Sequence, residues 1–217
     1  MLTLFVDAYY ISPYAFSCFV ALREKGVTFE METKNLSKRE HRQGDYPERS
    51  ITGRVPALRE RDERGDEFWL SESSAIIEYL DDRFPSPAHP TLLPRDARQR
   101  ARARMIMAWV RSDLMPIRDE RPTTTVFYER AETPLSPAAE AAAARLIQAA
   151  NTLIHDGKAS LFDSWSAADA DLALMLQRLA LNGHPIPDKV RAFIDAQWAR
   201  PSVRAWIDRE RIPYVAY

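Results

Sequence analysis

The stretch YYISPYAFSCFVAL, residues 9–22, combines a Ser-Pro pair with the single cysteine of the chain. Ser12-Pro13 is typical of a helix start, because serine is a favoured N-cap and proline fits the first helical turn. A serine oxygen can accept a backbone N–H while its own hydrogen is donated elsewhere. We therefore expect Ser12 to cap a helix and to offer a hydrogen-bond donor there.

Cys18 is the second candidate for chemistry in this stretch. With Pro13 as the first helical residue, Cys18 lies more than one turn inside the helix, rotated by about 240° from Ser12 at 3.6 residues per turn. A helix N-terminus lowers the pKa of a thiol only when the thiol lies close to it. Phe16 and Phe19 are its neighbours, so we interpret Cys18 as a packed thiol.

The sequence Gly53-Arg54-Val55-Pro56 comes just before a predicted strand. Proline removes a donor from the strand ladder, so it is confined to strand starts, edges and bends. A trans proline at the strand start is the commoner case. A cis proline in a tight bend would leave the Val55 backbone unpaired, where it could hydrogen-bond an extended peptide as an added strand.

Other chemistries find little support in the sequence. The four histidines lie at positions 41, 89, 155 and 184, without ligand spacing and without a second cysteine, so we expect no metal site. The chain has no G-x-S-x-G sequence and no glycine-rich phosphate loop, which disfavours hydrolases and nucleotide enzymes of the common types.

Composition narrows the class of protein further. The 217 residues are 46% hydrophobic and 28% charged, with a net charge of −1, so we expect a folded chain with no nucleic-acid partner and no affinity for an anionic membrane. A single cysteine forms no internal disulfide. The first ten residues lack a basic leader, and no apolar run reaches the ~20 residues that span a bilayer. We expect a cytoplasmic protein.

The order of apolar runs and turn residues predicts a βαβ unit followed by a ββα unit. The first helix runs from Ser12 to Gly26, and the length of this connection favours parallel strands on either side of it. Residues 34–50 are strongly charged and are predicted to form an exposed loop with a poor helix. The predicted strands cover 2–6, 27–33, 55–59 and 68–70, and the next helix begins at 71–73 and stops before Pro85.

A proline-rich stretch divides this first part from a helical second part. FPSPAHPTLLP, residues 84–94, holds four prolines and no regular period, so we place a linker at 85–94. Ser166 and Asp169 have the spacing of a capping box ahead of a long apolar run. The predicted helices of the second part cover 95–115, 137–156, the run that begins at Ser166, 189–199 and 202–209.

These motifs, in this order, resemble the glutathione S-transferase family. The βαβ-ββα order, Val-Pro before the third strand and Glu-Ser before the last helix are similar to its thioredoxin-like domain, and the proline-rich linker and capping box are similar to its helical domain. Ser-Pro resembles the serine-type branches, and the overall chain resembles bacterial YfcF-like members. The resemblance implies an α+β thioredoxin-like domain at 1–84, the linker, and an all-α domain at 95–217.

The resemblance implies a role for each matched position. Ser12 would donate its hydroxyl hydrogen to the sulfur of glutathione, the co-substrate. Val55 would pair its backbone with the cysteinyl part, with Pro56 cis. Glu72 would bind the γ-glutamyl ammonium and Ser73 the γ-glutamyl carboxylate. The last role also follows from physics, because a helix N-terminus favours an anion.

The carboxylate on the glycine of glutathione needs a cation. Arg54 stands where relatives often carry lysine, and Lys38 and His41 are further candidates. A solvated charged face would explain Lys38 and His41 equally well. Ser17 departs from the pattern, because relatives usually carry a basic residue there.

Several alternatives stay open. Tyr9 and Tyr10 rival Ser12, because other branches of the family use a tyrosine near the end of the first strand. The implied electrophile pocket lies between the domains and would include Tyr10, Tyr14 and Trp109, and the family implies a homodimer. Besides a detoxifying transferase, which could also reduce peroxides or disulfides, the chain could be a non-catalytic interaction protein. A glutathione-dependent isomerase of the maleylacetoacetate type ranks behind these, because its serine-cysteine-rich signature is absent.

Overall fold

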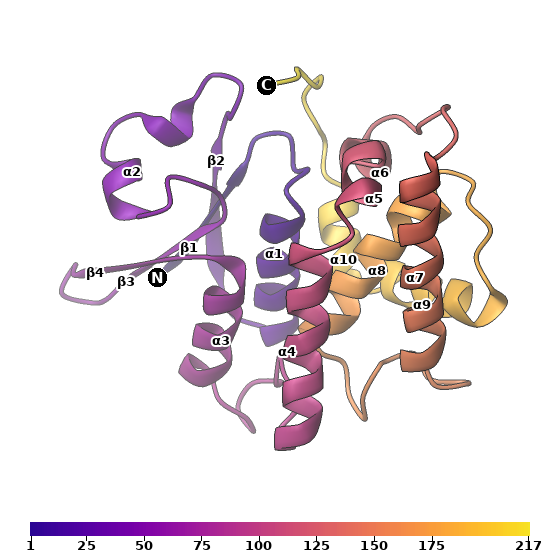
Figure 1. Ribbon diagram of the computed structural model, residues 1–217. Coiled ribbons are helices and arrows are strands. Elements are labelled where there is room, and N and C mark those ends of the chain that lie inside the picture. Colours follow the sequence, from indigo (N-terminus) through magenta and orange to yellow (C-terminus); the bar gives the residue numbers. More distant parts are fainter. The chain divides into compact units, whose positions relative to one another are not determined.

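The structure, a computed structural model, describes residues 1–217 and consists of two compact units (Figure 1). Unit 1 comprises Met1–Leu92 together with Asp208–Tyr217, and unit 2 comprises Leu93–Ile207. The sequence places 208–217 with the helical domain. In the structure this segment belongs with unit 1, because its arginine and tyrosine side chains pack on Tyr9 and Tyr10.

A four-stranded mixed sheet forms the centre of unit 1. Its order is β2-β1-β3-β4, in which β1 and β2 are parallel and the other pairs are antiparallel. Every residue of β1 is buried, which explains its continuous apolar run. The predicted parallel pair and the predicted hairpin are both confirmed. The strands are β1 (Leu2–Asp7), β2 (Phe29–Lys34), β3 (Ala57–Arg61) and β4 (Glu67–Ser71).

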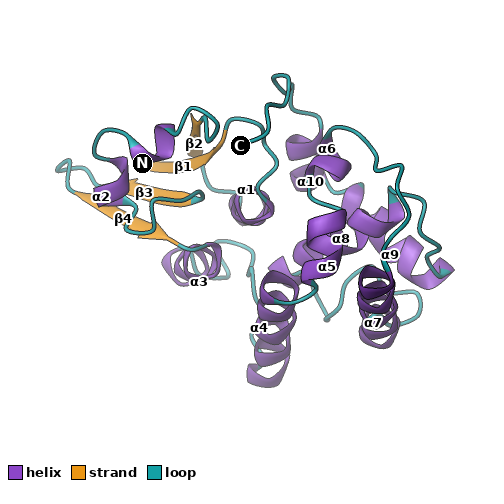
Figure 2. Cartoon of the chain, turned by 45° about the horizontal axis from the view of Figure 1, so that its top comes forward, coloured by secondary structure: helices purple, strands orange, loops and turns teal.

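Helices cover the two faces of this sheet unequally. The long helices α1 (Pro13–Lys25) and α3 (Ser73–Arg83) lie side by side on one face, and the short helices lie on the other (Figures 1 and 2). The segment predicted as an exposed loop holds η1 (Glu40–Arg42) and α2 (Tyr46–Arg49). Tyr46 holds it on the sheet, because its ring packs on Phe5 with centroids 5.4 Å apart.

A buried ion pair fixes the end of α1 to the segment that leaves unit 1. Lys25 is fully buried, and its ammonium donates to Asp81 Oδ1 and to the carbonyl of Pro90, both at 2.8 Å. The same Asp81 oxygen accepts the amide of Leu92 at 2.7 Å. Much of the predicted linker is therefore attached to unit 1 by hydrogen bonds to charged groups, which are among the stronger ones.

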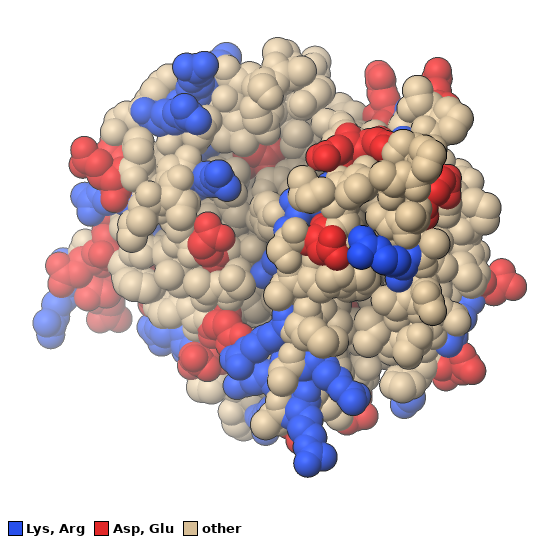
Figure 3. Space-filling view, viewed as in Figure 1, with Lys and Arg blue, Asp and Glu red and all other residues tan.

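Unit 2 is entirely helical, as predicted. Nearly every residue of α8 is buried, because α4, α5, α6, α7 and α9 pack around it. Helix α4 carries Arg98, Arg100, Arg102 and Arg104, and blue side chains gather over it in Figure 3. The helices are α4 (Ala97–Ser112), α5 (Met115–Glu120), α6 (Thr124–Phe127), α7 (Pro137–Leu153), α8 (Ala167–Ala180), α9 (Asp188–Trp198) and α10 (Pro201–Ile207).

The predicted capping box begins α8. Asp169 is fully buried, and its carboxylate accepts the amides of Ser166 and Leu161, both at 2.7 Å. Burial raises the pKa of Asp169 to about 6, although these backbone donors act in the opposite direction.

None of the helices combines the length and the apolar character needed to cross a membrane. The structure also contains no group of three or more His, Cys, Asp or Glu side chains arranged to hold a metal ion.

The raised pKa of Asp169 predicts a pH-dependent stability. Its folded value of about 6 lies above its ordinary value of 3.8, so the folded protein binds this proton more tightly than the unfolded chain does. The stabilisation is fully present below about pH 4 and is lost as the pH rises towards 6. Urea unfolding across this range should show the free-energy difference between wild type and Asp169→Asn falling by on the order of 2–3 kcal/mol. A difference that is constant or rises with pH would contradict this assignment.

Candidate functional site

Three loops of unit 1 meet at one edge of the sheet because of the strand register. Phe5 of β1 lies opposite Ala57 of β3, and Ala57 lies opposite Ser71 of β4. Since the neighbouring strands are antiparallel, β1 ends at the edge where β3 begins and where β4 ends. The loop that carries Ser12, the Val55-Pro56 bend and the start of α3 therefore lie near one another.

Ser12 is the N-cap of α1, as predicted. Its Oγ accepts the amide of Ala15 at 3.2 Å, and the side chain is partly exposed. The buried carboxylate of Asp7 accepts the amide of Ile11 at 2.7 Å and that of Ser12 at 3.0 Å. The hydroxyl is thus held at a helix start on a loop that is itself hydrogen-bonded from within.

Val55 lies two residues before β3, which begins at Ala57, and the Val55–Pro56 peptide bond is cis. Neither the N–H nor the C=O of Val55 has a backbone partner within the chain. The preceding residues are anchored, because the Tyr46 hydroxyl donates to the carbonyl of Arg54 at 2.7 Å and the amide of Gly53 donates to Ser50 Oγ at 3.1 Å. The backbone of Val55 can therefore pair with an added extended chain.

The Glu72-Ser73 pair forms the start of α3. Glu72 has φ 70° and is exposed, and Ser73 is the buried first residue of the helix. A non-glycine residue at positive φ costs on the order of 1–3 kcal/mol and often marks a functional site. Unlike α1, helix α3 begins without a side-chain cap hydrogen bond. Its first N–H groups can bind an anion.

The three predicted cations differ in their surroundings. Arg54 and Lys38 have exposed side chains. Burial, followed by the charges of Arg42 and Arg39, holds the pKa of His41 below its usual range. The imidazole of His41 is therefore uncharged at neutral pH, which favours the other two for an ionic role.

The tyrosines that rival Ser12 have different environments. Tyr9 is 1% exposed, and its hydroxyl shares a 2.8 Å hydrogen bond with Ser37 Oγ. Tyr10 is partly exposed at φ 52° and lies under the guanidinium of Arg209, 5.3 Å from the ring centroid. Tyr14, in the first turn of α1, is also partly exposed. Burial disfavours Tyr9 as the donor to a ligand, whereas Tyr10 stays an alternative to Ser12.

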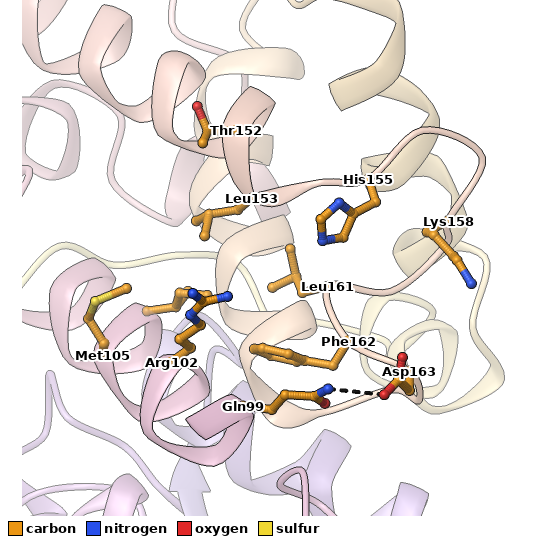
Figure 4. Close-up of a pocket in the computed structure, with 11 residues that line it drawn as sticks. Gln99, Arg102, Met105, Thr152, Leu153, His155, Lys158, Leu161, Phe162 and Asp163 are labelled. Carbon is orange, nitrogen blue, oxygen red and sulfur yellow. Dashed lines mark hydrogen bonds between the residues drawn. The ribbon is translucent and has the colours of Figure 1, made fainter. Parts of the chain in front are cut away.

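Trp109 lines a groove of about 660 Å³ within unit 2, between α4 and α7. Its indole N–H donates to Asp113 Oδ2 at 3.0 Å. A second hollow of about 430 Å³ adjoins the groove and is lined by Leu161, Phe162 and the polar side chains shown in Figure 4. The predicted grouping of Trp109 with Tyr10 and Tyr14 stays a prediction.

Comparison with known families decides the class of protein. Residues 11–83 match the family model for the glutathione S-transferase N-terminal domain, and residues 96–210 match the model for the C-terminal domain. The chain belongs to the glutathione S-transferase family. The α+β domain and the all-α domain predicted from the sequence are those of this family, so the predicted fold class is confirmed.

Two relatives of known name are isomerases. The chain is 40% identical over 111 residues to maleylacetoacetate isomerase from Pseudomonas aeruginosa, and this match covers 50% of the chain and 49% of the relative. It is 38% identical over 102 residues to maleylpyruvate isomerase from a Ralstonia species, covering 47% and 44%. The chain thus spans about half the length of the curated relatives it matches.

A solved structure is similar over nearly the whole chain. It is the structure of a glutathione transferase homolog from Burkholderia gl BGR1 with bound glutathione. Its sequence is 43% identical to this chain, and the TM-score of the two structures is 0.78. The match covers 95% of this chain and 96% of that one.

Asp7 is a residue of this site that the sequence analysis did not single out. The sequence did contain a signal for it: an acidic residue comes directly after an apolar run and a few residues before a Ser-Pro pair. If such a carboxylate is buried, it must find hydrogen-bond donors in the loop nearby. The segment 208–217 was also missed, since its sequence has no periodicity that points to a packing partner.

The burial of Cys18 predicts an unreactive thiol. Its side chain is fully buried, and Sγ lies 3.8 Å from the carbonyl oxygen of Ser73, as expected of a packed residue. A disulfide reagent such as Ellman's should label native protein only at the rate of its opening, and urea-unfolded protein at once and stoichiometrically. Rapid labelling of the native protein would show that the thiol is accessible and reactive.

Proposed function

We propose that this chain is a serine-type glutathione transferase in which Ser12 stabilises the thiolate of bound glutathione. The observation that carries the proposal is the convergence of three features at one sheet edge: the partly exposed Ser12 hydroxyl, the unpaired backbone of Val55 and the uncapped start of α3. The hydroxyl can donate a hydrogen bond to a thiolate, the Val55 backbone can pair with an extended peptide, and the start of α3 can bind a carboxylate.

This arrangement supports one specific way for glutathione to bind. The backbone of Val55, next to cis Pro56, pairs with the cysteinyl residue as a short antiparallel strand. The first turn of α3 at Ser73 binds the γ-glutamyl carboxylate, and the exposed carboxylate of Glu72 pairs with the γ-glutamyl ammonium. Arg54 binds the carboxylate on glycine, with Lys38 as the second candidate and His41, whose lowered pKa disfavours the charged form, as the third.

The chemistry requires the thiolate form of glutathione. A free thiol has a pKa of ~8.5, so only a few per cent is ionised at neutral pH. A hydrogen bond to a charged group contributes ~1.5–3 kcal/mol, which corresponds to a decrease of about one to two pKa units if it is made mostly to the thiolate. The Ser12 hydroxyl and the start of α1 supply stabilisation of this kind without a catalytic base.

The activated sulfur then attacks an electrophile. A carbon–sulfur bond forms, and the leaving group departs with its electron pair, or an addition product takes up a proton. The same thiolate can reduce a peroxide or a disulfide. We place the protein in the cytoplasm as a homodimer in the YfcF-like serine-type subgroup, with Tyr10, Tyr14 and Trp109 as candidates for the electrophile pocket.

Replacing Ser12 tests the central role. Ser12→Ala should raise the pKa of bound glutathione by about one to two units, because the thiolate loses its donor. The ultraviolet absorbance of the thiolate, titrated against pH, measures this pKa, and steady-state rates with a standard electrophile should fall at neutral pH.

Ser136 offers a matched control. Like Ser12 it caps a helix, precedes a proline and accepts an amide at 3.2 Å, here that of Ala139. Unlike the Ser12 hydroxyl, its own hydroxyl donates to the carboxylate of Glu120. Ser136→Ala removes the cap and the hydrogen bond that the hydroxyl donates to Glu120, so it should lower stability by ~1–3 kcal/mol and leave the thiol pKa unchanged. Equal pKa values in wild type and Ser12→Ala would remove Ser12 from its role, and Tyr10→Phe would then be the variant to measure. If calorimetry detects no glutathione binding by wild type, the non-catalytic interaction protein is the better interpretation.

A glutathione-dependent isomerase is the second candidate, favoured by the identity to the two isomerases over about half the chain. An isomerase adds the thiolate to its substrate and releases it again, so glutathione is regenerated, whereas a transferase consumes it. We expect turnover of maleylacetoacetate or maleylpyruvate to be slower than the transferase reaction with a standard electrophile. Fast turnover at constant glutathione concentration would make isomerisation the main activity.

A further inference from the structure

Asp7 is a buried carboxylate that contacts the main chain on which Ser12 lies. Its side chain is fully buried at the end of β1. One oxygen accepts the amide of Ile11 at 2.7 Å, and the other accepts the amide of Ser12 at 3.0 Å. Two consecutive amides bound by one rigid carboxylate restrict the backbone dihedrals just before the helix.

The segment Asp208–Tyr217 covers the same loop from outside. Tyr214 packs edge-on against Tyr9 with ring centroids 5.3 Å apart, and Tyr217 stacks on it at 6.0 Å. Arg209 lies over the rings of Tyr10 and Phe19, at 5.3 and 5.0 Å. Figures 1 and 2 both show this segment beside the loop that joins β1 to α1.

The segment also contributes charge next to Asp7. Burial raises the pKa of Asp7, whereas the amides of Ile11 and Ser12 and the positive charge of Arg211 act in the opposite direction. Burial raises the pKa of Tyr217 to about 12, and the negative charge of Asp7 adds to this effect. Both oxygens of Asp7 act as acceptors, which is the pattern expected of an ionised carboxylate.

We infer that Asp7 is a positioning residue for the reaction, which aims the Ser12 hydroxyl at the glutathione sulfur by holding the amides of Ile11 and Ser12. The inference rests on the proposed role of Ser12. Because Ser12 Oγ already accepts the amide of Ala15, its hydrogen is directed away from that N–H. The direction of that hydrogen depends on the N-cap backbone, and Asp7 restricts that backbone.

Asp7→Asn tests this role with little change in size. Asparagine has a single acceptor oxygen, so its NH₂ group must face one of the two amides, and one hydrogen bond is replaced by an unfavourable contact. We expect the pKa of bound glutathione to rise by about one unit and kcat at neutral pH to fall about tenfold, with a smaller change in KM for glutathione.

The Ser12→Ala background separates positioning from general damage. If Asp7 acts through Ser12, Asp7→Asn should add nothing to the thiol pKa shift of Ser12→Ala, which is a non-additivity typical of coupled residues. Asp169→Asn is the matched control, because Asp169 is also a fully buried carboxylate that accepts two backbone amides at a helix start, in unit 2. It should lower stability without changing the pKa of bound glutathione.

A second variant covers the case in which Asp7→Asn does not fold. An ester in place of the Ile11–Ser12 peptide bond, introduced by semisynthesis, deletes only the Ser12 N–H and keeps every side chain. It should raise the pKa of bound glutathione in the same direction.

The outcomes distinguish this inference from the proposed function. An unchanged thiol pKa in either variant, or a full additional shift in the Ser12→Ala background, overturns the positioning role while Ser12 keeps its own. If wild type binds no glutathione, or if Ser12→Ala alone leaves the thiol pKa unchanged, the proposed function fails and the inference fails with it.

Discussion

The antiparallel register of β3 between β1 and β4 is the constraint on which the candidate site depends. Pairing of Phe5 with Ala57, and of Ala57 with Ser71, brings the ends of three strands to one edge. A slip by one residue would turn every side chain of the slipped strand to the opposite face of the sheet. The hydrophobic packing of α1 and α3 on this sheet therefore also determines where the loops meet.

Hydrogen bonds at helix starts give this edge its chemical character. Ser12 and Ser136 both cap helices, and the amide of each donates to a carboxylate. Asp7 is fully buried and leaves the Ser12 hydroxyl alone, whereas the partly buried Glu120 also accepts the Ser136 hydroxyl. Helix α3 has no side-chain cap, and its first residue follows one at positive φ. The proposed site thus combines a stabilised helix start with one whose backbone donors are available to a ligand.

Long periodic elements were predictable from the sequence, and short ones were not. The apolar runs of β1 and α1, the glycine after α1 and the capping box of α8 lie where the sequence indicated them. The short helices η1, α2, α5 and α6 have too few residues for a periodicity to be visible. In α2, packing of Tyr46 on Phe5 orders a segment whose charged sequence indicates a loop.

The family resemblance, the strand and helix order, and the candidate site residues could all be predicted from the sequence, because they depend on local motifs and their order. These candidates are Ser12, Val55, Glu72 and Ser73. The burial of Cys18 was also predictable, from its place inside the helix. The burial of Tyr9 against Ser37 and the packing of segment 208–217 on the loop after β1 depend on the tertiary structure. The hydrogen bonds from the amides of Ile11 and Ser12 to the Asp7 carboxylate are also visible only in the structure. These features arise from contacts between side chains and loops whose spacing along the chain carries no signal, so they become visible only when the sheet and its helices bring them together.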